Sequence, residues 1–251
     1  MRKGGAHLLF FVLAIALFSS CTGMKYATKE KPMFTGFSVK WDGAPVQAKR
    51  AVTTELEGLV KPAPNRSIFG LRPTVALHNM VKEPAQPKGL ANTLRNKIGS
   101  APTYLADVPL ADIKAAMVNR MVNHGYFNAA ADYTVDRKGR KATVTFTVSA
   151  GVPYRIRNIS YGDSATALDR QIALSKRTAE VKSGHLYDLG ELTAERARVA
   201  SQVRNHGWYK LKEDDLIFAV DTTIGGHRLD MSLRVKQTTD SADRRKYTLG
   251  A

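Results

Sequence analysis

A five-residue motif that occurs twice limits most strongly how this chain can fold. Asn-His-Gly-Tyr-Phe at residues 123–127 returns as Asn-His-Gly-Trp-Tyr at residues 205–209, 82 positions later. Similarity at a fixed internal spacing indicates two copies of one structural unit. The 251 residues are enough for two domains of ordinary size. We therefore expect a tandem pair.

An amphipathic helix is predicted directly before each copy of the motif. The apolar stripe of the first helix consists of Leu110, Ile113, Met117 and Met121. The stripe of the second helix consists of Leu192, Val199 and Val203. Both stripes have the spacing of one buried helix face. Glu195 interrupts the second stripe where the first has Ile113.

The glycine of each motif is expected to end its helix. Gly125 and Gly207 follow the last residues of the two stripes. Only glycine takes the left-handed conformation there without a steric penalty. The aromatic residues after the glycines are Tyr126, Phe127, Trp208 and Tyr209. They could form a platform for a bound chain, but we expect them to pack across a sheet.

Alternating apolar residues predict three strands in each unit. Residues 34–41 and 154–161 alternate at the start of the units, and each is followed by a predicted helix, at 47–60 and 165–175. Residues 142–148 and 229–235 alternate again after turns at 136–139 and 222–226. The predicted fold is α+β: two β-α-α-β-β units, each with a three-stranded sheet and two helices on one face.

The N-terminus has the features of an export signal. Arg2 and Lys3 precede an apolar run at residues 8–18, and Ser19 and Ser20 come directly before Cys21, the only cysteine. The run of eleven residues is too short to span a bilayer, which needs roughly 20. Small residues before a cysteine are typical of lipoprotein processing, so we predict a lipid on Cys21. The alternative is an ordinary cleaved signal peptide that leaves Cys21 as a free thiol.

The predicted mature chain is strongly basic. After loss of residues 1–20 it has 36 basic and 22 acidic residues, a formal charge of +14. An exported lipoprotein does not meet nucleic acid, so we expect anionic lipid headgroups, lipopolysaccharide or acidic protein faces as partners. The alternative is that scattered Lys and Arg residues only keep the chain soluble.

Residue patterns of enzymes and metal sites are missing from the sequence. Five of the histidines are isolated from one another: His78, His124, His185, His206 and His227. They do not form a zinc motif, and no serine lies in a Gly-x-Ser-x-Gly elbow. His124 and His206 share a repeat position, which favours a role beside the last carbonyls of a helix. We expect no catalytic residues, no metal and no cofactor, and a cell-envelope hydrolase is the less favoured alternative.

The order of elements, with glycine and aromatics after the second helix, resembles the POTRA (polypeptide-transport-associated) domains of outer-membrane barrel-assembly proteins. Short segments resemble the lipoprotein branch of the translocation and assembly module (TamL-like, a relative of BamA and TamA): Lys25-Tyr26, Phe34-Thr35-Gly36, 61–65 and 192–198. The resemblance implies a signal peptide at 1–20, a lipidated linker at 21–32, and POTRA-like units at 33–151 and 152–238. Residues 239–251 are expected to be a tail or the start of a further unit.

The resemblance also implies a function. We expect a periplasm-facing scaffold at the outer membrane that docks unfolded outer-membrane proteins, a barrel or another assembly subunit by strand addition, at residues 127–135 or 209–221. The alternatives are a rigid spacer or an independent envelope lipoprotein that binds no client. Family members continue into a β-barrel. We therefore expect either a truncated product or a pair that works beside a barrel from another chain.

The first unit contains a proline-rich insertion at residues 61–106. Its prolines oppose helices and central strands, although 90–98 could form a short basic helix with Arg95 and Lys97 pointing outward. The insertion is expected to be a brace for the first unit or, less favoured, a contact surface for a partner.

Overall fold

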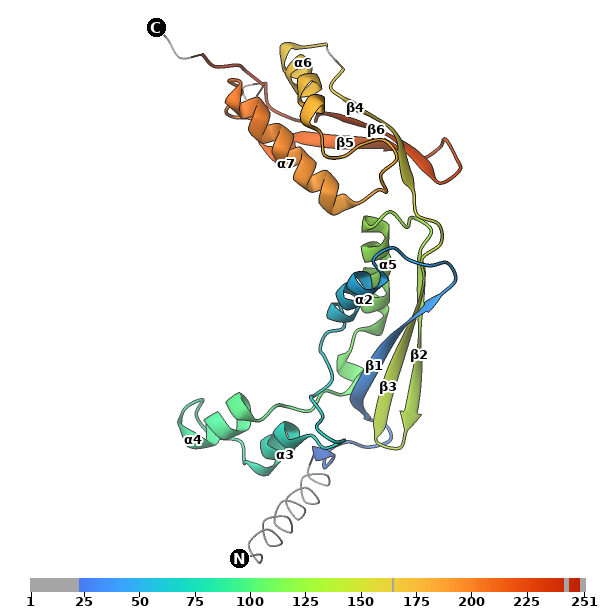
Figure 1. Cartoon of the computed structure of the whole chain (residues 1–251). Helices are drawn as coiled ribbons and strands as arrows, with labels where there is room; N and C mark the ends of the chain where they lie inside the picture. The colour runs from blue at the N-terminus through green and yellow to red at the C-terminus, as the bar shows by residue number, and fades with distance from the viewer. Residues whose placement is uncertain (1–22, 164, 242–243, 249–251) are drawn as a thin grey trace, which may run out of the picture. The chain divides into compact units, whose positions relative to one another are not determined.

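The computed structural model describes residues 23–163, 165–241 and 244–248 (Figure 1). These residues form two compact units. The first contains the described residues up to Asp42 together with Val46–Met117 and Ala131–Val148, and the second contains Gly43–Pro45, Val118–Ala130 and the described residues from Ser149 onward. The predicted signal peptide and Cys21 lie outside the described residues. No described helix is long and apolar enough to cross a membrane.

The first sheet is built from three strands in the order β1-β3-β2. Its strands are β1 (Met33–Asp42), β2 (Ala130–Lys138) and β3 (Lys141–Ser149). The helices α2 (Lys49–Gly58) and α5 (Leu110–Asn123) lie on one face of it (Figure 1). The last residues of α5 are counted in the second unit.

The second sheet repeats this arrangement in the order β4-β6-β5. Its strands are β4 (Arg155–Tyr161), β5 (Leu216–Asp221) and β6 (Arg228–Val235). Its helices are α6 (Ala167–Leu174), which continues into the 3-10 turn η3 (Ser175–Thr178), and α7 (Leu189–Asn205). β6 pairs parallel with β4 and antiparallel with β5. The predicted α+β fold of two β-α-α-β-β units is confirmed.

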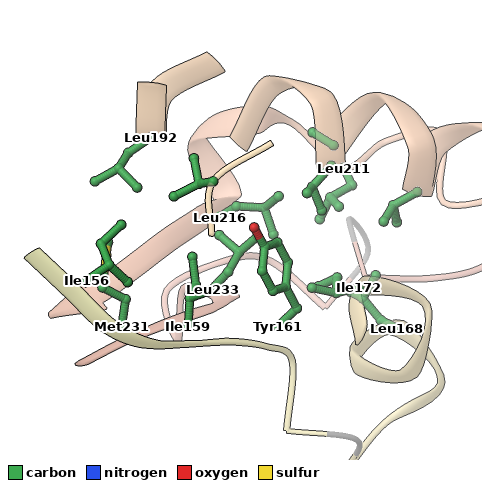
Figure 2. Close-up of a cluster of buried hydrophobic side chains, with 14 of the residues drawn as sticks. Ile156, Ile159, Tyr161, Leu168, Ile172, Leu192, Leu211, Leu216, Met231 and Leu233 are labelled. Carbon is green, nitrogen blue, oxygen red and sulfur yellow. The ribbon is translucent and has the colours of Figure 1, made fainter. Parts of the chain in front are cut away.

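Each sheet buries the apolar side of its alternating strands against the helices. In the second unit, Ile156 and Tyr161 of β4 lie with Leu233 of β6 in one cluster with side chains of α6 and α7 (Figure 2). In the first unit the corresponding buried side chains are Phe34, Val52, Leu56, Ile113, Met117, Val144, Phe146 and Val148. Burying a side chain of this size stabilises a fold by roughly 1.5–3 kcal/mol. The alternating apolar residues of the strands and the apolar stripes of the helices therefore form one hydrophobic core in each unit.

The insertion of the first unit contains more helix than its prolines suggest. Its elements are α3 (Pro73–Met80), α4 (Gly89–Asn92), the π-helix η1 (Thr93–Ile98) and the 3-10 turn η2 (Leu105–Asp107). Pro73 occupies the start of α3, where a missing N–H costs no helical hydrogen bond. The short basic helix predicted at 90–98 is present as α4 and η1.

The predicted outward direction of Arg95 is wrong. Its Nη1 donates to the carbonyls of His78 at 2.6 Å and Val81 at 2.7 Å. These carbonyls belong to the C-terminal end of α3, where a cation offsets the negative end of the helix dipole. Arg95 therefore holds two helices of the insertion together.

Candidate functional site

The glycines of the repeated motif have the left-handed conformation that the sequence predicts. Gly125 has φ of 82° and Gly207 has φ of 103°. Each glycine also lies close to another backbone: a Cβ on Gly125 would be 2.6 Å from the carbonyl oxygen of Tyr187, and one on Gly207 would be 2.8 Å from that of Tyr247. Two independent constraints, a positive φ and a close approach, therefore select glycine at both positions.

The carbonyl of each motif glycine accepts a hydrogen bond from the backbone amide of a tyrosine that lies later in the chain. The amide of Tyr154 donates to the carbonyl of Gly125 at 2.9 Å, and β4 begins at the next residue, Arg155. Its ring lies 4.8 Å from that of Phe127. Likewise, the amide of Tyr247 donates to the carbonyl of Gly207 at 2.8 Å.

The ring of Tyr247 contacts the second motif as the ring of Tyr154 contacts the first. It lies 4.5 Å from the ring of Tyr209, as the Tyr154 ring lies beside Phe127. Residues 244–248 thus occupy, after the second motif, the place that the lead into β4 occupies after the first.

The four aromatic side chains of the motifs divide into two kinds. Tyr126 and Trp208, directly after the glycines, are buried. Phe127 is half-buried and packs between Tyr154 and Tyr187. Tyr209 is 56% exposed. The first aromatic of each pair therefore packs in a core, as expected, whereas the Tyr209 side chain is exposed.

The histidines of the two motifs have different partners. The Nδ1 atom of His206 lies 2.8 Å from the carbonyl oxygen of Gln202, one turn back in α7, as expected for a histidine beside the last carbonyls of a helix. The Nδ1 atom of His124 lies 2.8 Å from Oδ2 of Asp188. The other oxygen of Asp188 accepts from the amides of Gly190 and Glu191 and so caps α7. One carboxylate therefore caps α7 and contacts His124, which the spacing of the motifs did not suggest.

The outer edge of β1 is covered at its start by the insertion. Met33 forms an antiparallel bridge with Tyr104. The amide of Phe34 donates to Thr103 at 2.9 Å, and that of Leu105 donates to Pro32 at 3.0 Å. These bonds satisfy backbone groups at the start of the edge, which is a property of a brace.

β4 is covered at the same place by the residues before α7. Arg155 forms an antiparallel bridge with Leu186. The amide of Ile156 donates to His185, and the amide of Gly184 donates to Ile156 in return. In both units a short segment just before the second helix therefore closes the start of the edge strand that opens the unit. An isolated bridge has no periodic sequence pattern, so the sequence did not predict these closures.

The opposite edge of the second sheet, β5, has open backbone groups. The amide of Lys236 donates to Asp215 at 2.7 Å, which makes this a hydrogen-bonded antiparallel pair. Because such pairs alternate along the ladder, Ile217, Ala219 and Asp221 turn their N–H and C=O groups toward β6. Leu216, Phe218 and Val220 turn theirs away from β6.

One of these outward groups already has a partner. The carbonyl of Leu216 accepts from Nη1 of Arg196 at 3.3 Å. In the described part of the chain, the outward groups of Phe218 and Val220 pair with no other strand. About two residues of strand edge are therefore available at the end of β5 that lies away from Arg196.

The available end of β5 lies beside apolar surface and a groove. Ile217 is 39% exposed and Val220 is 40% exposed. A groove of about 550 Å³ is lined by residues of all three strands, including Val220 and Met231, and by Lys176 and Ser183. An extended chain that pairs with β5 would find both backbone partners and a groove for side chains.

The corresponding edge of the first sheet, β2, is more strongly charged. Its charged residues are Asp132, Asp136, Arg137 and Lys138. Lys138 lies 3.0 Å from Asp136, and Lys114 of α5 lies 3.9 Å from Asp132. Charges along an edge discourage a second strand from pairing with it. Asp221 is the single charged residue of β5, so β5 is the better of the two predicted edges.

Titratable groups of the described chain form no metal site. No group of three or more His, Cys, Asp or Glu side chains in this part could hold a metal ion. Among the described residues, Glu195 is the most buried charged side chain, and the sequence pattern predicted it only as an interruption of the apolar stripe of α7. It accepts hydrogen bonds from Tyr161 and Arg198 and has a structural role in the core.

Three solved structures are similar to this chain. POTRA domains 3–5 of BamA from Haemophilus influenzae share 12% identity, with 82% of this chain and 61% of that chain covered and a TM-score of 0.36. POTRA domains 1–2 of the periplasmic domain of Omp85 from Anabaena share 9% identity, with 81% and 94% covered and a TM-score of 0.35. CdiB from Escherichia coli shares 13% identity, with 94% and 35% covered and a TM-score of 0.30.

The matched regions are only part of some of these structures. The chain spans about three fifths of the BamA fragment and about a third of CdiB. No family model matches the sequence, and no curated protein matches it. All three TM-scores lie below 0.5.

Proposed function

We propose that this protein is a POTRA-type scaffold of the outer-membrane assembly machinery, anchored by a lipid on Cys21 and facing the periplasm. It docks extended segments of unfolded outer-membrane proteins, or of a partner subunit, by strand addition. The barrel that receives the client belongs to the same assembly. The TamL-like branch is the relative that the sequence segments favour.

The observation that carries this proposal is the difference between the two edges of the second sheet. The start of β4 is closed by residues 184–187, whereas β5 offers outward groups at Phe218 and Val220 beside a groove. Backbone hydrogen bonds do not depend on the side chains of the client, so one edge can serve many sequences. Transmembrane β-strands alternate apolar and polar residues, and the apolar face of such a strand suits the exposed Val220 and the half-buried Phe218, which lie on the same face of β5.

Proline at position 220 tests strand addition directly. Val220→Pro removes an N–H that points away from β6, so the β5–β6 ladder keeps its bonds while an added strand loses one. Val220→Ala is the matched control, because it shortens the same side chain and keeps the N–H. The probe is a synthetic peptide with the alternating sequence of an outer-membrane β-strand, crosslinked through a photoreactive residue at Ile217.

The expected result is that crosslinking survives Val220→Ala and falls several-fold in Val220→Pro, with unchanged circular dichroism. Ala219→Pro, which removes an N–H directed at β6, should instead lower the stability of the unit. Equal crosslinking of Val220→Pro and Val220→Ala would rule out docking by strand addition at β5. A spacer would then be the better account, and assembly would depend on the length of the pair but not on its edges.

The contacts of Tyr247 support a further part of the proposal. Its amide and ring repeat the contacts of Tyr154, which leads into the first strand of the second unit. We accordingly interpret residues 239–251 as the start of a further unit.

A further inference from the structure

A basic cavity lies at the end of the first unit where the described chain begins. It has a volume of about 280 Å³ and is lined by Gly23 and Met24, by residues 70–72, and by Lys138, Arg140 and Lys141. Figure 1 shows the first described residues, α3 and the turn between β2 and β3 together at this end. Four cations and no carboxylate line the cavity.

Arg72 is the most buried of these cations and is incompletely paired. Its side chain is at the start of α3, and the residue is 8% exposed. Nη2 donates to the carbonyl of Thr35 at 3.1 Å, whereas the buried Nε has no hydrogen-bond partner. Buried donors are nearly always satisfied, and a buried charge without a counter-charge is costly. Burial lowers the pKa of Arg72, but a guanidinium keeps its charge in proteins.

The other cations of the cavity are held to different degrees. Lys138 pairs with Asp136 at 3.0 Å, outside the lining. Nη1 of Arg140 donates to the carbonyl of Met24 at 3.2 Å, which places this guanidinium against the first described residues. Lys141 is exposed and has no ion pair in the described part of the chain. Arg72, Arg140 and Lys141 therefore offer donors to one anion.

An apolar hairpin tip adjoins the cavity. Ile68 and Leu71 form an antiparallel bridge that closes a turn with Phe69 and Gly70 at its tip. The Phe69 side chain is fully exposed, and Ile68 is half-exposed. Gly70 and Leu71 line the cavity, so the apolar tip and the cations belong to one surface. A fully exposed aromatic next to a basic cavity is a combination that suits the interface of a bilayer.

From this arrangement we propose that the first unit binds a membrane surface directly, with the phosphate of a phospholipid headgroup in the cavity of Arg72, Arg140 and Lys141 and with Phe69 inserted among the acyl chains. A membrane is the nearby source of phosphate if Cys21 carries the lipid of the proposed function, on which this choice of occupant rests. Cys21 is two residues before Gly23, so an extended chain separates them by at most about 7 Å. A lipid on Cys21 would thus keep the headgroup region within reach of the cavity.

The test uses the chain from residue 21 onward, which contains every described residue, with Cys21→Ser so that no anchor contributes. Binding to vesicles of phosphatidylcholine with phosphatidylglycerol is measured by co-sedimentation. Arg72 is buried, and its replacement could unfold the insertion, so the exposed Arg140→Glu and Lys141→Glu carry the test. Lys40→Glu, an exposed reversal near the other end of β1, is the matched control. Phe69→Ser is compared with Ile217→Ser of the second unit.

The anchorless chain should bind these vesicles, and each reversal at the cavity should weaken binding about fivefold or more, while Lys40→Glu changes it less. Phe69→Ser should weaken binding about tenfold, because the phenyl group loses its apolar environment. Equal effects of cavity and control reversals would overturn the proposal. A second result would also overturn it: inorganic phosphate stabilises the chain, Lys141→Glu removes this stabilisation, and the chain does not bind vesicles. The ligand of the cavity would then be a free phosphate. Failure of the anchor itself would leave these measurements unchanged and would appear only in the native, lipidated form.

Discussion

The hydroxyl of Tyr161 donates a 2.7 Å hydrogen bond to Oε1 of Glu195 inside the core of the second unit. Arg198, one turn along α7, donates to both oxygens of the same carboxylate at 2.6 and 2.8 Å. Glu195 is 1% exposed, and the Tyr161 ring lies among the apolar side chains of the cluster (Figure 2). A carboxylate is thus accommodated in the helix stripe because its charge is paired and hydrogen-bonded.

The first prediction concerns the Tyr161 hydroxyl. Tyr161→Phe removes one donor and leaves the ring in place, so Glu195 keeps Arg198 but loses a buried bond. We expect the free energy of unfolding of the second unit to fall by about 1–3 kcal/mol. Urea denaturation followed by Trp208 fluorescence, in a Trp41→Phe background, measures it. Phe218→Leu, a half-buried aromatic substitution without a polar group, is the comparison, and an equal loss in both would mean that the hydrogen bond contributes little.

A second prediction follows from the pKa of Glu195. Burial raises this pKa, but hydrogen bonds from Arg198 and Tyr161 outweigh burial and hold it below the ordinary 4.5. A carboxyl with a depressed folded pKa contributes stability above its unfolded pKa, and the contribution is lost as pH falls through the folded value. The native chain should therefore lose stability below about pH 4.5, whereas Glu195→Gln should be less stable at pH 7 and lose less on acidification. Parallel urea titrations at pH 7 and pH 3 decide this.

Local periodicity was sufficient to predict the strands of both sheets and the two helices that cover each of them, because each helix stripe or alternating strand lies within one stretch of sequence. It did not predict helix α3 of the insertion. It was not sufficient for Glu195, which was predicted only as an interruption of the stripe. Its partner Tyr161 is 34 residues away on β4, and only the packed sheet brings the two together. The closures of β1 and β4 by Tyr104 and Leu186 were missed for the same reason, since a single bridge has no pattern of its own.

The third prediction separates two constraints on the motif glycines. Gly125 has a positive φ and a backbone oxygen 2.6 Å from the place of a Cβ, whereas Gly139 has a positive φ of 61° and open space. Gly139→Ala should cost about 1 kcal/mol of stability through the backbone conformation alone. Gly125→Ala should cost clearly more, because the Tyr187 backbone must move. Similar melting temperatures for the two variants would show that the close approach at Gly125 is easily relieved.

A fourth prediction concerns Arg95 and the insertion. Arg95→Ala removes two donors from the C-terminal carbonyls of α3, His78 and Val81, so the end of that helix should fray. Amide hydrogen exchange should speed up for residues near the end of α3, while the amides of β3 remain protected. Lys97→Ala, a neighbouring basic residue of η1, is the control. Unchanged exchange in Arg95→Ala would mean that α3 does not depend on this contact.

The last prediction concerns the anchor on Cys21. Lipoprotein processing needs the cysteine sulfur, so Cys21→Ala should abolish incorporation of radiolabelled palmitate, and high salt should then extract the protein from the membrane fraction. Gly23→Ala is the matched control, because a Cβ there would lie at an ordinary 3.6 Å from the Arg72 carbonyl. If the segment were an ordinary cleaved signal peptide, neither variant would incorporate label and both would fractionate like the native chain.

Salt extraction separates the two modes of membrane attachment. Two or more acyl chains hold a protein durably at a bilayer, so the lipidated chain should resist extraction by high salt. Attachment through the basic cavity alone should weaken as the salt concentration rises.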